Sequence, residues 1–108
     1  MSLNFVAVDV ETANAQRGSI CSFGLAVVEN GTVVRTENWL TRPPAQLDWF
    51  DGFNISLHGI TPGMVKDAPT FDERLAQVLE VVGDRPVVAH KAAFDIGAIR
   101  QGCTEDGL

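Results

Sequence analysis

The chain has 108 residues, of which 45% are hydrophobic and 20% are charged, and its formal net charge is -6. This composition indicates one soluble globular domain spanning residues 1–108. With no apolar run near the roughly 20 residues of a membrane span and no signal peptide, we expect a cytoplasmic location. The acidic charge argues against a nucleic-acid partner unless bound divalent cations reverse the local field, and two distant cysteines exclude a disulfide scaffold.

Three β-strands are predicted in the first forty residues, over residues 5–10, 20–29 and 32–40. In each of them, side chains of different character alternate with the period of two that a strand requires. Asn30-Gly31, between the second and third strands, is the strongest hairpin signal in the chain, because both central positions of a tight two-residue turn need positive φ. An antiparallel meander is therefore expected.

Two carboxylates interrupt the apolar first strand. Asp9 and Glu11 are two positions apart, so on a strand they share one face, while Val6, Val8 and Val10 share the other. At a separation of about 6.6 Å along a rigid strand, the two acids can hold a divalent cation between them. The alternative is that the strand ends near Asp9 and both acids lie in a solvated turn.

The middle of the chain combines a loop with a helix. Residues 42–44, Arg-Pro-Pro, are expected to end strand pairing because proline has no N–H to donate. Residues 45–68 lack a clean period but are rich in apolar side chains, so a long ordered loop is expected there. Residues 70–73, Thr-Phe-Asp-Glu, form a capping-box pattern, and apolar residues at helical spacing follow it as far as Val82, with Gly83 as the stop.

The last third of the chain is expected to return to the sheet. Residues 86–89 form a short apolar run typical of a strand buried on both faces, and residues 92–101 have a helical pattern. A right-handed crossover would set the strand parallel to the first strand, which would bring Asp95 close to Asp9 and Glu11. The predicted class is α/β with a mixed sheet: three antiparallel strands, then a helix, a parallel strand and a helix.

Three segments of the sequence, in order, resemble motifs of the DEDD-type 3'-5' exonucleases related to the epsilon proofreading subunit of bacterial DNA polymerase III. Residues 5–12 (FVAVDVET) resemble the first motif, residues 89–95 (AHKAAFD) the second, and residues 54–62 (NISLHGITP) the segment between them. Lys91 departs from the asparagine common at its position. The resemblance covers nearly the whole chain and implies a ribonuclease-H-like fold, which agrees with the predicted element order.

The resemblance also implies an activity and a site. It implies a metal-dependent 3'-5' exonuclease that hydrolyses phosphodiesters at the 3' end of DNA or RNA. Asp9, Glu11 and Asp95 would be the catalytic residues and the ligands of two Mg²⁺ or Mn²⁺ ions. Thr12 and His58 would bind substrate, although His58 could instead only cap the turn that follows it. The implied partners are the single-stranded 3' end of a nucleic acid and a DNA polymerase subunit, with no membrane involved.

One part of the family pattern is missing from the sequence. The third motif, a histidine followed five residues later by an aspartate, does not occur, so we expect the chain to be the N-terminal part of such a domain, without its last strand and helix. General-base help is worth about two to four decades in rate, so we expect weak or no activity from the 108 residues alone. The alternatives are a non-catalytic nucleic-acid-binding or interaction module on the same fold, and an enzyme that cuts inside a strand.

Overall fold

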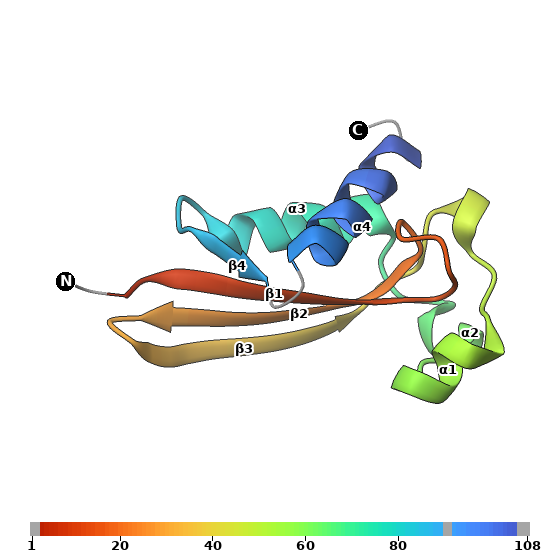
Figure 1. Ribbon diagram of the computed structural model, residues 1–108, viewed down its shortest axis with the longest axis horizontal. Coiled ribbons are helices and arrows are strands. Elements are labelled where there is room, and N and C mark those ends of the chain that lie inside the picture. The colour runs from red at the N-terminus through yellow and green to blue at the C-terminus, as the bar shows by residue number, and fades with distance from the viewer. Residues whose placement is uncertain (1–2, 90–91, 106–108) are drawn as a thin grey trace.

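One mixed sheet forms the centre of the molecule. The computed structural model describes residues 3–89 and 92–105, and within these residues the sheet has four strands in the order β3-β2-β1-β4. β1 is antiparallel to β2, β2 is antiparallel to β3, and β4 is parallel to β1, as Figure 1 shows. This arrangement confirms the predicted α/β class and crossover. The strands are Phe5–Thr12 (β1), Ile20–Glu29 (β2), Thr32–Leu40 (β3) and Val87–Ala89 (β4).

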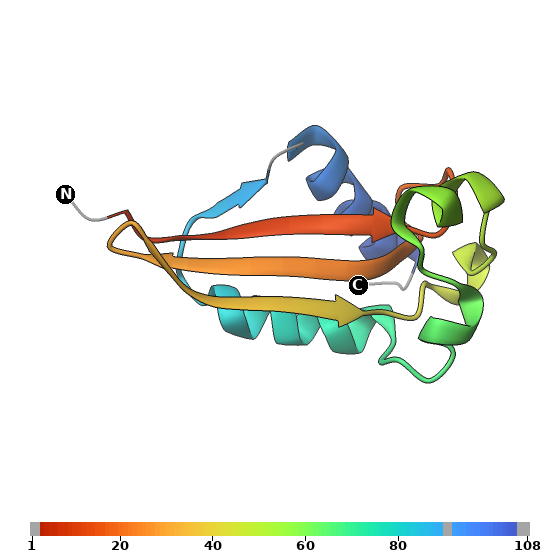
Figure 2. The ribbon, with the colours of Figure 1, turned by 90° about the horizontal axis from the view of Figure 1, so that it is seen from below.

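Two longer helices cover one face of this sheet. α3 (Phe71–Val82) and α4 (Ala92–Glu105) lie on the same side, behind the strands in Figure 2, and the opposite face is turned toward the viewer there. The core lies between the helices and the sheet. Its buried side chains come from β1, β2, α3 and α4, and they are Val6, Val8, Val10, Ile20, Phe23, Leu25, Val27, Phe71, Val78, Val82 and Ala98.

Local sequence signals account for the ends of several elements. Asn30 and Gly31 have φ values of 52° and 76°, so the predicted tight turn between β2 and β3 is confirmed. At the start of α3, the Glu73 carboxylate accepts hydrogen bonds from the Thr70 N–H at 3.2 Å and from the Thr70 hydroxyl at 2.8 Å. The predicted capping box is therefore present, and α3 ends at Val82, as its apolar period indicated.

Residues 45–68 differ from the loop that was predicted. They contain a 3-10 turn at Ala45–Leu47 and two short helices, α1 (Gly52–His58) and α2 (Pro62–Val65), located beyond the end of β1 in Figure 1. The helices have seven and four residues, too few to show an apolar period. Their signals are terminal ones: the Asp51 carboxylate caps α1, and Gly59 ends it at a φ of 73°.

The prediction that residues 86–89 form a strand buried on both faces was wrong. Val87 and Val88 point to opposite faces and are 44% and 49% exposed. The physical reason is position: in the described part of the chain β4 is an edge strand that pairs only with β1. Within residues 3–89 and 92–105, no helix combines the length and the hydrophobicity that crossing a bilayer requires.

The contact between α4 and α3 gives a test of the packing. A Cβ added at Gly102 would lie 2.7 and 2.8 Å from atoms of the Phe71 ring, which is 1% exposed and held in the core. We expect Gly102→Ala to lower the free energy of unfolding by about 1 to 3 kcal/mol, as overpacking usually does. Urea unfolding followed by circular dichroism measures this change.

Gly97→Ala is the matched control in the same helix. Among the described residues, its Cβ would meet the flexible Arg17 side chain, 3.3 Å from the nearest guanidinium nitrogen. Alanine favours a helix by up to about 1 kcal/mol over glycine, so this variant should be neutral or slightly more stable. Equal effects of the two substitutions would contradict the packing described here.

Candidate active site

Asp9 and Glu11 lie on β1, on the face of the sheet that α3 and α4 leave open. Both are exposed, while the alternate residues of the strand are buried. β1 pairs with β2 through both acids, with Asp9 opposite Gly24 and Glu11 opposite Ser22. The alternative in which the strand ends near Asp9 is therefore wrong, and the two carboxylates project from a continuous strand.

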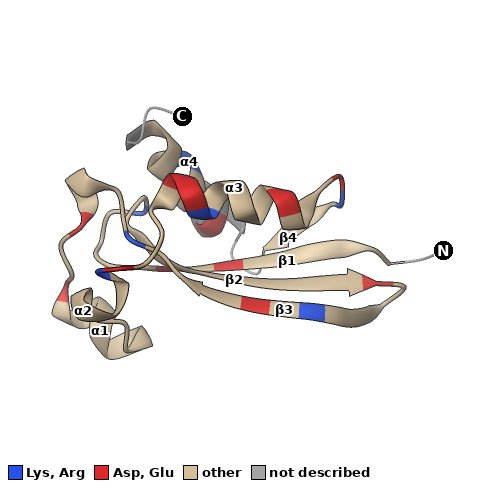
Figure 3. Ribbon diagram, turned by 180° about the vertical axis from the view of Figure 1, so that it is seen from behind, with Lys and Arg blue, Asp and Glu red and all other residues tan. Residues whose placement is uncertain are grey.

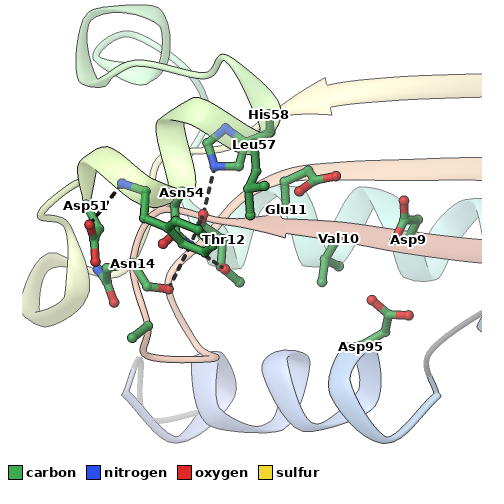
Figure 4. A pocket seen from close by; sticks show the side chains of 12 residues that line it. Asp9, Val10, Glu11, Thr12, Asn14, Asp51, Asn54, Leu57, His58 and Asp95 are labelled. Carbon is green, nitrogen blue, oxygen red and sulfur yellow. Dashed lines mark hydrogen bonds between the residues drawn. The ribbon is translucent and has the colours of Figure 1, made fainter.

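Asp95 reaches the same region from the other side of β1. It lies in the first turn of α4 and is only 2% exposed. Within the described residues, the pairing of β4 with β1 runs as far as Val8, opposite Ala89, one residue before Asp9. Figure 4 shows the Asp95 carboxylate pointing toward this part of β1. The crossover thus brings an acid 84 positions later in the sequence to the end of the first strand.

All three acids border one pocket of about 600 Å³ at the end of β1 (Figure 4). β1, the turn after it, α1 and the start of α4 form its walls. The twelve lining residues are Asp9, Val10, Glu11, Thr12, Asn14, Ala15, Asp51, Phe53, Asn54, Leu57, His58 and Asp95. Four of them are carboxylates, and none is lysine or arginine, so the pocket is strongly acidic. In Figure 3, the Lys and Arg positions along the ribbon are scattered rather than gathered on one element.

The donor atoms of the pocket suit a hard divalent cation. Carboxylate oxygens are the ligands that Mg²⁺ prefers, and Mn²⁺ accepts the same set. Among the residues that the structure describes, no three His, Cys, Asp or Glu side chains lie close enough together to form a metal centre by themselves. Mg²⁺ commonly binds through one or two carboxylates with water and a substrate phosphate completing its shell. Asp9, Glu11 and Asp95 therefore fit such an ion by chemistry, in an arrangement that is open rather than closed.

Thr12 and His58 are brought together by the structure. Thr12 is 7% exposed, and its carbonyl oxygen lies 2.8 Å from His58 Nε2 at the end of α1. The Ile60 N–H donates to His58 Nδ1 at 2.9 Å, which leaves the proton of the neutral ring on Nε2, where it points at Thr12. The bond from Ile60 is the kind expected if His58 caps the turn that follows it. The ring also borders the pocket.

Several pocket residues were missed by the reading of the sequence. Asn54 lies within the segment that resembles the family, residues 54–62, and its side chain donates to the carbonyl oxygens of Thr12 and Asn14. The sequence gives no signal of these bonds. Phe53 and Leu57 are each 69% exposed and stand one turn apart on α1, where both line the pocket. Their i, i+4 spacing was the available signal. Residues 90 and 91, in the predicted second motif, lie outside the described residues.

Cys21 lies behind the site, at an irregularity of the β1–β2 pairing. The register shifts between Glu11 and Thr12, which pair with Ser22 and Ile20, so Cys21 is the extra residue on β2. The thiol is fully buried, and its sulfur lies 4.0 Å from His58 Nε2. Burial, and secondly the negative charge of Glu11, raise the pKa of Cys21 to about 12, so the thiol is not a nucleophile at neutral pH.

The chain is similar to known proteins in both sequence and fold. The family model RNase_T, described as exonuclease, matches residues 6–105. A PolC-type DNA polymerase III of Mycoplasmopsis pulmonis is 29% identical over 106 residues, which cover 96% of this chain and 7% of the polymerase. The chain thus spans only a small fraction of the length of such polymerases.

Two solved structures agree with this match. Exonuclease X, in complex with 5' overhanging duplex DNA, has 28% sequence identity and a TM-score of 0.73 over 87% of this chain and 52% of its own. The nuclease domain of 3'hExo, a DEDDh family member bound to rAMP, has a TM-score of 0.79 at 21% identity, covering 99% of this chain and 61% of its own. The expected ribonuclease-H-like fold is confirmed.

The buried thiol predicts how stability changes with pH. The pKa of Cys21 is about 12 in the folded chain and 9.0 in its ordinary state. Between these values the unfolded chain loses the thiol proton and the folded chain keeps it, so the free energy of unfolding falls as pH rises. One such group contributes at most about 1.4 kcal/mol per pH unit. Cys21→Ala should therefore show a shallower fall than the wild type in urea unfolding above about pH 9, and parallel curves would count against this explanation.

Proposed function

The chain belongs to the exonuclease family, and from this membership we propose that the complete protein containing it is a metal-dependent 3'-5' exonuclease of DNA or RNA. One observation of the structure carries the proposal: among the residues that the structure describes, the pocket is bordered by four carboxylates and by no lysine or arginine. A phosphodiester is itself negatively charged, so it approaches such a pocket only when cations neutralise the carboxylates. Exonucleases of this family generally use divalent metal ions.

Asp9, Glu11 and Asp95 have the central role in this proposal. They are the candidates to hold Mg²⁺ or Mn²⁺, Asp9 and Glu11 from β1 and Asp95 from α4. Two ions held there would neutralise charge on the phosphate and activate a water molecule for attack on phosphorus. Both β1 carboxylates project from residues paired to β2, and the register of this pairing shifts directly after Glu11. The burial of Asp95 limits its side chain to few positions.

The other side of the pocket is suited to the terminal nucleotide. Thr12 and His58 border the pocket beside Glu11. Thr12 is the proposed contact for this nucleotide, while both ring nitrogens of His58 are already bonded within the protein. Phe53 and Leu57 add an exposed apolar surface on which a base could stack, as aromatic and apolar side chains do in proteins that bind single strands. A free 3' end, whose bases are unpaired, fits this combination of an acidic floor and an apolar wall.

The general base is a separate question. His58, the histidine among the lining residues, uses both ring nitrogens within the protein, so it is not available to take a proton from water. His90 is outside the described residues. We therefore retain the expectation that the 108-residue chain alone is weakly active or inactive, because general-base help is worth about 10²- to 10⁴-fold. The PolC-type relatives suggest a DNA polymerase as partner, and this context also remains a proposal.

The competing function is a non-catalytic nucleic-acid-binding or interaction module on the same fold. The observation that favours it is the lack, among the described side chains, of three acids or other ligands close enough to form a metal centre by themselves. The two functions differ in their response to metal, because a binding module needs no carboxylates to hold a catalytic ion.

Removal of the carboxylates tests the proposal in the complete protein. Asp9→Asn, Glu11→Gln and Asp95→Asn should each reduce the release of nucleotides from a 5'-labelled single strand by at least about 100-fold, because each loses a ligand charge. Chelation of divalent ions should abolish the wild-type activity, and Mn²⁺ or Mg²⁺ should restore it.

Asp84→Asn is the matched control. Asp84 is an exposed acid outside the pocket, so its loss should leave the rate unchanged. A wild-type protein that binds a single strand without shortening it, with or without metal, would favour the non-catalytic module. Cutting of a circular single strand would instead show an enzyme that acts inside the strand.

A further inference from the structure

We infer that Asn54 and His58 form a clamp on α1 that positions the end of β1, and with it Glu11, for the reaction. This inference rests on the proposed function but concerns how the site is held in shape. It makes both side chains positioning residues and gives His58 a role other than binding the nucleotide. We call the pair the α1 clamp.

The end of β1 needs support from outside the sheet. Its pairing with β2 shifts register between Glu11 and Thr12, and in the described residues its pairing with β4 is recorded as far as Val8. A strand whose ladder is interrupted by an irregularity is held less firmly at that point than within a regular ladder. Glu11 lies at this point of the strand, so the direction of its carboxylate depends on what fixes the next peptide.

The carbonyl oxygen of Thr12 is what the α1 clamp holds. His58 Nε2 donates to it at 2.8 Å and Asn54 Nδ2 donates at 3.1 Å, as the dashed lines in Figure 4 show. A carbonyl oxygen has two lone pairs, so the two donors satisfy it completely. Asn54 Nδ2 also lies 3.2 Å from the carbonyl oxygen of Asn14, which extends the hold to the turn beyond the strand.

Asn54 and His58 are one turn apart on α1, so their side chains project from the same side of the helix. The His58 ring is also held in one orientation, because the Ile60 N–H donates to Nδ1 and so fixes the tautomer. Hydrogen bonds beside a metal ligand can orient that ligand without touching the ion.

The base of α1 is tied to the same turn by a separate set of bonds. The Asp51 N–H donates to the Ala13 carbonyl oxygen at 2.9 Å. Asn14, which is 1% exposed, donates from Nδ2 to the carbonyl oxygens of Leu47 and Trp49 at 3.0 and 2.8 Å. These bonds hold the N-terminal end of α1 against the turn after β1, so Asn54 and His58 project from a helix whose position is fixed.

Two substitutions of His58 separate positioning from nucleotide binding. In His58→Gln the amide nitrogen occupies the place of Nε2 and can still donate to Thr12, whereas in His58→Asn the amide oxygen replaces Nδ1 and only the bond from Ile60 remains possible. In the complete protein, His58→Asn should lower kcat and Mn²⁺ affinity by about 10- to 100-fold with KM unchanged. His58→Gln should recover most of both. Asn54→Leu, which removes the N–H donors at similar size, should resemble His58→Asn.

Ser56→Ala is the matched control on α1, because Ser56 is exposed and its hydroxyl bonds only to the Phe53 carbonyl oxygen of the same helix. It should leave kcat and Mn²⁺ affinity unchanged. Equal losses in the Gln and Asn variants of His58, or a rise in KM alone, would overturn the α1 clamp and indicate a nucleotide contact instead.

Two readouts do not depend on nuclease activity. Mn²⁺ affinity is measured by electron paramagnetic resonance without substrate, so it tests the α1 clamp even if the complete protein cleaves nothing. The ¹⁵N shifts of the His58 ring in the wild-type protein test it without any substitution. Protonated Nε2 and unprotonated Nδ1 support the clamp, and protonated Nδ1 or averaged shifts overturn it. If the complete wild-type protein cleaves nothing, but the Mn²⁺ affinities and the ¹⁵N shifts are those expected for the α1 clamp, only the proposed function is contradicted.

Discussion

The two-sided character of β1 is the constraint on which the rest of the structure depends. Val6, Val8 and Val10 are buried against α3 and α4, and each buried valine contributes about 1.5 to 3 kcal/mol. The alternate positions, including Asp9 and Glu11, face the open side, where solvated carboxylates carry little desolvation cost. One strand therefore anchors the core and presents the acids, so the core fixes the direction of the site.

The pocket lies where the regular sheet gives way to the turn after β1. The β1–β2 ladder contains an irregularity there, and α1 lies beyond the end of the strand. Asp95 borders the pocket from α4, while Asn54, Leu57 and His58 border it from α1. Asn54 bonds to the carbonyl oxygen of Thr12, and Asn14 bonds to that of Leu47, so side-chain hydrogen bonds connect the turn to the segment that follows β3.

The electrostatics of the pocket connect its structure to its chemistry. The described part of the chain places four carboxylates around the pocket, and no lysine or arginine: Asp9, Glu11, Asp51 and Asp95. Carboxylates gathered in this way favour cations and, through cations, phosphates. The overall charge of -6 is thus compatible with the proposed nucleic-acid substrate, because divalent ions bound at the site would reverse the sign of the local field.

The sequence by itself determined the elements whose signals are local. Alternation along residues 5–12, the Asn30-Gly31 turn and the Thr70 capping box depend on near neighbours only, and each is present in the structure. It also indicated three acids at one site, because a parallel crossover has one favoured hand. Tertiary structure alone decided the exposure of Val87 and Val88, which depends on which strands flank β4. The same holds for Asn54 and His58: their bonds to Thr12 span more than forty residues, and a periodic pattern carries no record of contacts made at that distance.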